Sequence, residues 1–99
     1  MKQDLFEWDT EKNLLNQIKH GIAFEEAVLA FDDQNKIIKP DLTHSEGEDC
    51  YFCFGRIHDR IATVRFTYRG SVIRIYGAAY WRNGRKIYEE ENGKRGKLH

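Results

Sequence analysis

The segment from Arg60 to Ala78 constrains the fold most, because polar and apolar residues alternate in it on both sides of Gly70. Such alternation is typical of half-buried strands, and two such runs joined by a tight turn predict a β-hairpin. If Arg69 and Gly70 are the two loop residues, the apolar side chains share one face and form the core. The opposite face then places Arg65 directly across from Arg74.

Two arginines that face each other repel unless an anion or a carboxylate lies close to them. In one interpretation, Asp or Glu side chains from another element neutralise them, as in many structural ion pairs. In the other interpretation, the two guanidinium groups form a phosphate-binding site, because the planar array of N–H donors in each group matches the geometry of phosphate oxygens. A three-residue loop would shift the register by one residue and undo this Arg65–Arg74 pair.

The length of 99 residues predicts one domain with a single core, spanning residues 1–99. The chain has no apolar run of membrane-spanning length and no apolar signal region at its start, which predicts a soluble cytoplasmic protein. Its net charge is zero, but the charged residues are segregated along the chain. Of the 16 acidic residues, 12 lie in residues 1–55, and of the 16 basic residues, 11 lie in residues 56–99. We expect a basic side that can meet phosphates, unless the two halves neutralise each other through packing.

Two helices are predicted near the N-terminus. The first begins at Asp9 or Thr10 and ends at Gly21, which suits the left-handed position after a helix. Its apolar stripe, expected to face the core, contains Leu14, Leu15 and Ile18. The second helix has apolar residues at i, i+3, i+4 and i+7, namely Phe24, Ala27, Val28 and Phe31.

The rest of the chain favours strands, with one ambiguous segment near the end. Short strands are predicted at Phe6–Trp8, Lys36–Lys39 and Cys50–Phe54, and helices followed by antiparallel strands indicate an α+β domain. Residues 80–91 fit either a helix or a hairpin turn at Asn83-Gly84, since the glycine costs a helix about 1 kcal/mol relative to alanine. The basic tail, residues 92–99, is expected to be flexible.

The potential metal ligands point weakly to a metal site. Cys50 and Cys53 have C-x-x-C spacing, but in a strand they point to opposite faces, and no second cysteine pair exists. The acidic loop with His44, Glu46 and Glu48 lacks an element that fixes ligand geometry. We expect structural thiols, no metal and no cofactor.

Five short motifs follow one another along the chain: FEWD (Phe6–Asp9), KHG (Lys19–Gly21) with Asn16 before it, FEEA (Phe24–Ala27), FDD (Phe31–Asp33) and HSEGE (His44–Glu48). Gly55, the hairpin residues Thr67, Arg69 and Arg74-Ile75, and Tyr88-Glu89 extend this pattern over about residues 6–90. Together the motifs resemble the BrnT ribonuclease toxins of type II toxin–antitoxin systems, a branch with a RelE-like fold.

The resemblance implies two N-terminal helices packed on an antiparallel sheet of about four strands, with a C-terminal helix over residues 80–91. It also implies a single BrnT-like domain that cleaves RNA without a metal. A cognate antitoxin with a DNA-binding domain would hold it inactive in a 2:2 complex. In two places the chain departs from the family. Gly77 and Ala79 stand where a Ser and an Arg are usual, and Arg82 and Arg85 stand where the last helix has a capping Thr and Glu.

Metal-free RNA cleavage needs a base for the 2′-hydroxyl, charge on the scissile phosphate and an acid for the leaving oxygen. His20 is the first acid–base candidate and His44 the second, because imidazole titrates near neutral pH. The catalytic set expected from this chemistry is Arg65, Arg74, His20 and Lys19. Substrate contacts are expected from Trp8, which would stack on a base, and from Arg69, Tyr76, Arg82 and Arg85.

Each of these residues also has a structural interpretation, with Trp8 in the core, Tyr76 as a strand residue and the histidines at a helix end or in a loop. Two functions therefore stay open at this point. The chain is either a ribonuclease or a catalytically degenerate module that binds an antitoxin or nucleic acid without turnover.

Overall fold

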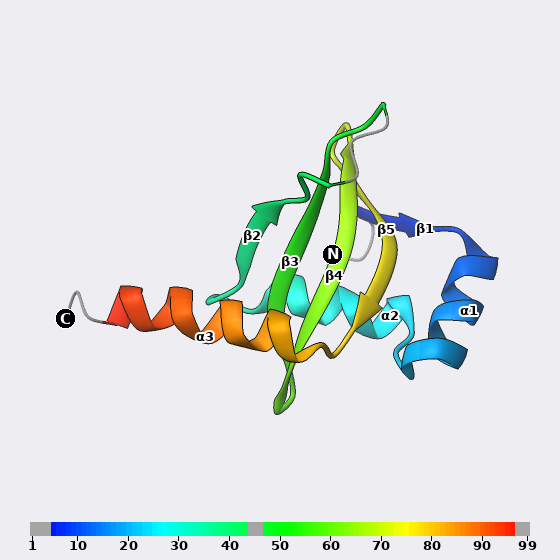
Figure 1. Cartoon of the computed structure of the whole chain (residues 1–99). Helices are drawn as coiled ribbons and strands as arrows, with labels where there is room; N and C mark the ends of the chain where they lie inside the picture. Colours follow the sequence, from blue (N-terminus) through cyan, green and yellow to red (C-terminus); the bar gives the residue numbers. More distant parts are fainter. Residues whose placement is uncertain (1–4, 44–46, 97–99) are drawn as a thin grey trace.

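The structure is a computed structural model that describes residues 5–43 and 47–96. It is an α+β fold built on a five-stranded mixed sheet with strand order β1-β5-β4-β3-β2 (Figure 1). β1 runs parallel to β5, and all other neighbouring strands are antiparallel. Along the chain the elements are β1 (Phe6–Trp8), α1 (Thr10–His20), α2 (Phe24–Ala27), η2 (Val28–Asp32), β2 (Ile37–Pro40), β3 (Cys50–Ile57), β4 (Arg60–Arg69), β5 (Val72–Ala79) and α3 (Arg82–Gly96).

The expected antiparallel sheet of about four strands is wrong, because β1 adds a fifth strand in parallel at one edge. A three-residue strand carries too little sequence to specify its partner, so its pairing with β5 depends on the tertiary fold. The expected second helix is also shorter than its apolar spacing suggests. Only Phe24–Ala27 is α-helical, and the chain continues as the 3-10 turn η2.

The two faces of the sheet carry separate cores. α2 and η2 cover one face, and α3 crosses the lower end of the other face in the view of Figure 1. The main core lies under α2 and η2, where Phe24, Val28, Val64 and Phe66 are at most 3% exposed. Burial of such side chains stabilises a fold by about 1.5–3 kcal/mol each. Under α3, the smaller core consists of Ile37, Phe54, Ile61 and Tyr88.

β4 and β5 form the predicted hairpin, but its loop residues are Gly70 and Ser71. Gly70 has a φ of 62°, as the first central position of a type II′ turn requires. Arg74 therefore lies opposite Thr67, while a bulge leaves Arg65 opposite Gly77. The predicted cross-strand pair of Arg65 and Arg74 is wrong, although alternation keeps both side chains on one face of the sheet.

α1 has the predicted ends but not the predicted buried side. The Asp9 carboxylate accepts hydrogen bonds from Glu11 N and Lys12 N, and Gly21 takes the left-handed conformation after the last turn. The apolar stripe faces solvent, because Leu14, Leu15 and Ile18 are 55%, 54% and 81% exposed. The expectation that this stripe packs in the core is therefore wrong.

Polar side chains make the inner side of α1, because the helix stands beside the end of β5 and not over the face of the sheet (Figure 1). Asn16 Nδ2 donates to the carbonyls of Ile22 and Ala78, both at 2.9 Å, and Asn16 Oδ1 accepts from Ala78 N at 3.2 Å. Asn13 Oδ1 accepts from Phe24 N at 2.8 Å, at the start of α2. Both asparagines are buried where backbone groups need partners.

The ambiguous segment is a helix, as the resemblance favours. α3 extends to Gly96, into the tail expected to be flexible, while residues 97–99 lie outside the described part. Tyr88 on α3 donates a 2.6 Å hydrogen bond to Asp33 Oδ2 and so fastens the helix to the segment after η2. Burial opposes ionisation of Asp33, but hydrogen bonds from Tyr88 and from the Arg56 and Asn35 amides hold its pKa below the ordinary value of 3.8.

Gly84 allows α3 to approach β4 closely. A methyl group at this position would overlap Thr63 Oγ1 and press on Phe54, whereas Gly93 on the same helix has open space around it. The glycine that looked like a turn signal is thus a packing residue.

Alanine substitutions at Gly84 and Gly93 of α3 are expected to change the free energy of unfolding in opposite directions. Gly84→Ala is expected to destabilise the protein by about 1–3 kcal/mol, because the buried helix–sheet contact becomes overpacked. Gly93→Ala is expected to stabilise it by about 0.5–1 kcal/mol through helix propensity. Urea denaturation of both variants measures the difference, and equal shifts would contradict the close-packing role of Gly84.

The two cysteines are buried free thiols on opposite faces of β3, as predicted. Burial raises the pKa of Cys53 to about 12, so this thiol stays protonated and unreactive. Within residues 5–43 and 47–96, no helix is long and apolar enough to cross a membrane.

Candidate functional site

A small pocket of about 100 Å³ lies where the end of α1 and the start of α3 approach β4 and β5. It brings together three residues that the sequence predicts for RNA cleavage or binding: His20, Arg65 and Tyr76. The remaining lining residues are Asn16, Thr63, Gly77, Ala78 and Trp81.

His20 is the last residue of α1, directly before the left-handed Gly21. Its imidazole packs against the indole of Trp81 edge to face, with ring centroids 5.9 Å apart. This contact connects the end of α1 with the residue before α3. His20 is exposed and lines the pocket, so its imidazole can contact a ligand that binds there.

Arg65 lies on β4, and its guanidinium donates hydrogen bonds to two neighbours and lies over the ring of Tyr76. Arg65 Nε lies 3.0 Å from Asp41 Oδ2, and Arg65 Nη2 lies 3.5 Å from Cys50 Sγ. The described residues offer no hydrogen-bond partner to Nη1. The carboxylate therefore fixes the orientation of the arginine while part of its fork remains able to bind an anion.

Tyr76 is the half-buried bulge residue of β5. Its hydroxyl donates a 2.7 Å hydrogen bond to Glu48 Oε1, and Glu48 also pairs with Arg69 at 3.2 Å. Burial, reinforced by the bond to Glu48, raises the pKa of Tyr76. The hydrogen bond from Tyr76 lowers the pKa of Glu48, and the charge of Arg69 acts in the same direction. Near neutral pH this pair is a protonated tyrosine and a carboxylate, so Tyr76 can donate a hydrogen bond but cannot act as a base.

Six of the nine predicted site residues do not line this pocket, namely Arg74, Trp8, Lys19, Arg69, Arg82 and Arg85. Arg74 pairs with Glu7 on β1 at 3.0 Å, which follows from the parallel register that sets the two side by side. Trp8 is half-buried and packs edge to face on Phe24, as the core interpretation expected. Lys19 is exposed at the end of α1. His44, the second acid–base candidate, lies outside the described residues.

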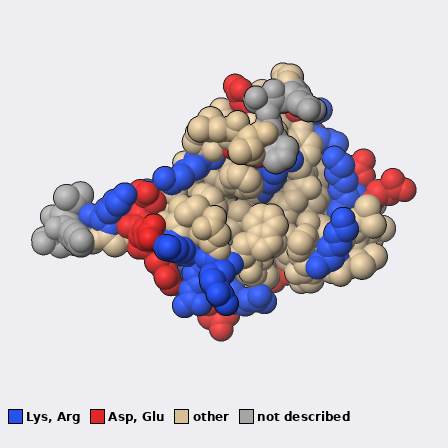
Figure 2. All heavy atoms as spheres, viewed as in Figure 1, with Lys and Arg blue, Asp and Glu red and all other residues tan. Residues whose placement is uncertain are grey.

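Arg82 and Arg85 line a second, larger pocket of about 450 Å³ on the other side of Trp81. Figure 2 shows Lys and Arg side chains gathered over the start of α3 and the tip of the β3–β4 hairpin. The charge segregation of the sequence thus produces a local basic surface.

Five residues of the small pocket were not predicted as site residues, and Thr63 and Trp81 are the most informative of them. Thr63 is 3% exposed, and its Oγ1 has no hydrogen-bond partner among the described residues. Trp81 is 50% exposed and lines both pockets. Period-two spacing from Arg65 was a usable signal for Thr63, whereas nothing local distinguishes the exposed Trp81 from the half-buried Trp8.

A group of three or more His, Cys, Asp or Glu side chains suited to a metal ion does not occur in the described part of the chain. Asp41 and Cys50 instead accept hydrogen bonds from Arg65, and Glu48 accepts one from Tyr76.

Comparison with models of known protein families identifies the family of this chain. A family model described as "Ribonuclease toxin, BrnT, of type II toxin-antitoxin system" matches residues 8–84. The chain belongs to the BrnT family. A comparison with curated proteins gives no match to this sequence. Membership of a family of type II toxin–antitoxin ribonuclease toxins implies an RNA target and an antitoxin partner.

The BrnT match covers every residue that lines the small pocket and ends at Gly84, near the start of α3. The motif residues divide between structure and site. Asp9 caps α1 and Glu7 neutralises Arg74, while His20 and Glu48 belong to the pocket or its supporting bonds. Gly77, where the resemblance leads one to expect a serine, lies opposite Arg65, and a Cβ at this position would make an ordinary contact of 3.9 Å with Asn16 Oδ1.

Proposed function

We propose that this BrnT family member is a metal-independent endoribonuclease and that the small pocket is its active site. The observation that carries the proposal is the convergence of His20, Arg65 and Tyr76 on one pocket from three separate elements. These side chains can supply a base for the 2′-hydroxyl and both charge and a hydrogen bond for the scissile phosphate, which are two of the three requirements of RNA cleavage without a metal.

In the proposed mechanism Arg65 binds the scissile phosphate through the free side of its fork and stabilises the charge that develops there. Asp41 holds the guanidinium in place, so the arginine needs little reorganisation when the substrate binds. His20 takes the proton of the 2′-hydroxyl, and the 2′-oxygen bonds to the phosphorus as the bond to the 5′-oxygen breaks. The leaving 5′-oxygen takes its proton from solvent water. Tyr76, kept protonated by burial, turns its single O–H from Glu48 to a phosphate oxygen when the substrate binds.

The proposal includes the cellular context that the resemblance implies. A cognate antitoxin with a DNA-binding domain neutralises the toxin in the cytoplasm, in a complex of two toxins and two antitoxins. A mass measurement on the co-purified complex tests this stoichiometry.

The direct test is incubation of the purified protein with RNA in the presence of EDTA. We expect new RNA fragments at a rate that chelation leaves unchanged, because the pocket residues supply all the charges that the reaction uses. Fragments that disappear with EDTA and return with Mg²⁺ would contradict the metal-independent mechanism.

A second candidate function is a binding module without turnover. Two observations favour it: Gly77 and Ala79 replace polar family residues beside Arg65 and Thr63, and Asp41 already engages Arg65. In that case the wild-type protein binds RNA or its antitoxin but gives no fragments at any enzyme concentration, with or without EDTA.

A further inference from the structure

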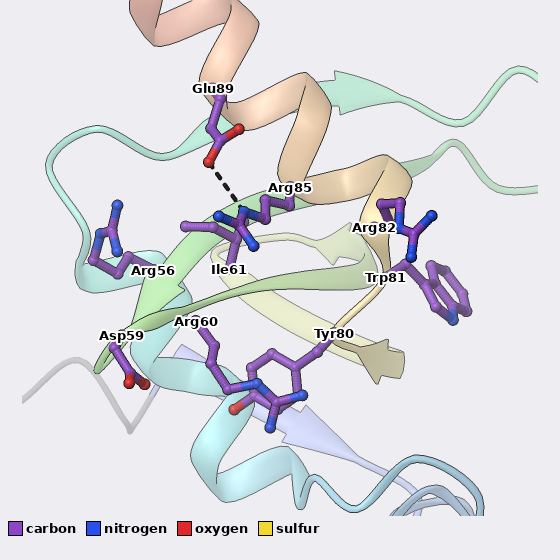
Figure 3. A pocket seen from close by; sticks show the side chains of 9 residues that line it. All are labelled: Arg56, Asp59, Arg60, Ile61, Tyr80, Trp81, Arg82, Arg85 and Glu89. Carbon is purple, nitrogen blue, oxygen red and sulfur yellow. Dashed lines mark hydrogen bonds and ion pairs between the residues drawn. The ribbon is translucent and has the colours of Figure 1, made fainter.

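The larger pocket lies between the β3–β4 hairpin and the first turns of α3, and four arginines line it against two carboxylates (Figure 3). Arg60 comes from the hairpin, whereas Arg82 and Arg85 come from α3. The carboxylates are Asp59 and Glu89. Side chains from two separate elements thus present positive charge to one volume of about 450 Å³.

Three of the four arginines of this pocket are weakly engaged by the rest of the protein, whereas Arg56 lies over the ring of Tyr88. No carboxylate among the described residues forms an ion pair with Arg60 or Arg82. Arg60 lies over the ring of Tyr80, with its guanidinium carbon 3.7 Å from the ring centroid, which limits its motion while leaving its donors free (Figure 3). Among the described residues Arg85 forms an ion pair only with Glu89. The pair is exposed and has the less favourable order along the helix, so an anion can replace that partner.

The position of these charges on α3 adds to the positive potential. The first turn of α3 contains no acidic residue, although carboxylates are favoured at helix starts and cations are disfavoured there. Arg82 and Arg85 therefore raise the potential of the pocket at some expense to the helix. A bound anion would offset the repulsion between these arginines and the positive end of the helix dipole.

Trp81 connects the larger pocket with the candidate active site. Its indole lines both pockets, is half exposed, and touches the imidazole of His20. A ligand that occupies both pockets must pass this ring. Single-stranded nucleic acid is recognised by this combination of exposed aromatic rings and arginines along its backbone.

We propose that the larger pocket binds the backbone of single-stranded RNA that continues from the candidate active site, with Arg60, Arg82 and Arg85 on phosphates and Trp81 stacked on a base. The proposal deepens the proposed function and rests on it for the identity of the ligand. RNA fits better than an acidic protein segment, because Trp81 presents a flat ring beside the acid–base candidate and the pocket offers few apolar anchors for a peptide.

Binding measured without cleavage tests this subsite. The probe is a fluorescent single-stranded RNA oligonucleotide with 2′-O-methyl groups, which cannot be cleaved, and its affinity is measured by anisotropy over a range of salt concentrations. Each of Arg60→Gln, Arg82→Gln and Arg85→Gln is expected to reduce the slope of log affinity against log salt by about 0.7, the value for one phosphate contact on a single strand. Trp81→Ala is expected to weaken binding about 5- to 100-fold without changing that slope.

Two further variants sharpen the test. Arg95→Gln removes an exposed arginine near the far end of α3 and is expected to leave the slope unchanged. Glu89→Gln frees Arg85 and is expected to tighten binding. Thermal unfolding of each variant confirms that the fold persists.

Slopes that stay unchanged in all three pocket variants would overturn the subsite. It would also be overturned if a polyglutamate peptide bound as tightly as the oligonucleotide and Trp81→Ala affected neither ligand, since the pocket would then suit an acidic protein segment. These outcomes are separable from the fate of the nuclease. Cleavage by wild type with unaltered binding by the variants removes only the subsite, whereas arginine-dependent binding without cleavage removes only the nuclease.

Discussion

Replacing His20 with asparagine is expected to lower the rate of RNA cleavage by about 10²- to 10⁴-fold, the usual contribution of a general acid or base. Asparagine keeps a polar side chain of similar reach but cannot exchange a proton with the substrate. Because His20 is exposed at the end of α1, the free energy of unfolding should change little. Single-turnover cleavage, with excess protein over RNA, measures the chemical step directly.

The matched control for this variant is His58→Asn. His58 is also exposed, and its φ of 57° suits asparagine, which tolerates the left-handed region well. It lines neither pocket. Wild-type cleavage by His20→Asn, or equal losses in both histidine variants, would exclude the proposed role of His20.

Replacing Asn16 with alanine is expected to destabilise the protein by roughly 2–5 kcal/mol, since each buried polar group left without a partner costs about 1–3 kcal/mol. The substitution removes three hydrogen bonds at once and leaves the carbonyls of Ile22 and Ala78 and the amide of Ala78 without their partner. It also detaches α1 from β5 one turn before His20. Chemical denaturation measures the stability loss, and cleavage should fall with it.

Two variants isolate the role of the Asn16 side chain. Asn16→Asp keeps the acceptor for Ala78 N but loses both donated bonds, so its loss should approach that of alanine. Asn35→Ala, at an exposed asparagine, is expected to change stability by no more than about 0.5 kcal/mol. If Asn16→Ala proved as mild as Asn35→Ala, α1 would be held to the sheet by other contacts.

Several features were predictable because they depend on local chemistry. Asp9 and Gly21 delimit α1 through their own cap geometry, and alternation along β4 and β5 predicts a hairpin whatever else the chain does. The turn position was missed by one residue, because Arg69-Gly70 and Gly70-Ser71 both offer the glycine that a tight turn needs. That single step moved Arg74 away from Arg65.

The candidate site was only partly predictable for a related reason. Spacing and motif resemblance identified His20, Arg65 and Tyr76, which the fold brings together. The same reasoning favoured Trp8 over Trp81. Trp8 lies in a short strand and Trp81 in a short loop, and the neighbouring residues do not show which of the two side chains is buried. Leu14, Leu15 and Ile18 misled for the opposite reason: helical spacing shows which residues share a side but not which side faces the protein.

The sequence alone determined the α+β class, the ends of α1, the β-hairpin and the membership of a ribonuclease toxin family, because these follow from neighbouring residues and motif order. Tertiary structure alone decided that β1 pairs with β5 and that Asn16, not the apolar stripe, joins α1 to the sheet. It also decided that Arg65 forms an ion pair with Asp41 and that Arg74 forms one with Glu7. Each of these is a contact between residues far apart in the chain. The free energy of such a contact depends on geometry that no local pattern encodes.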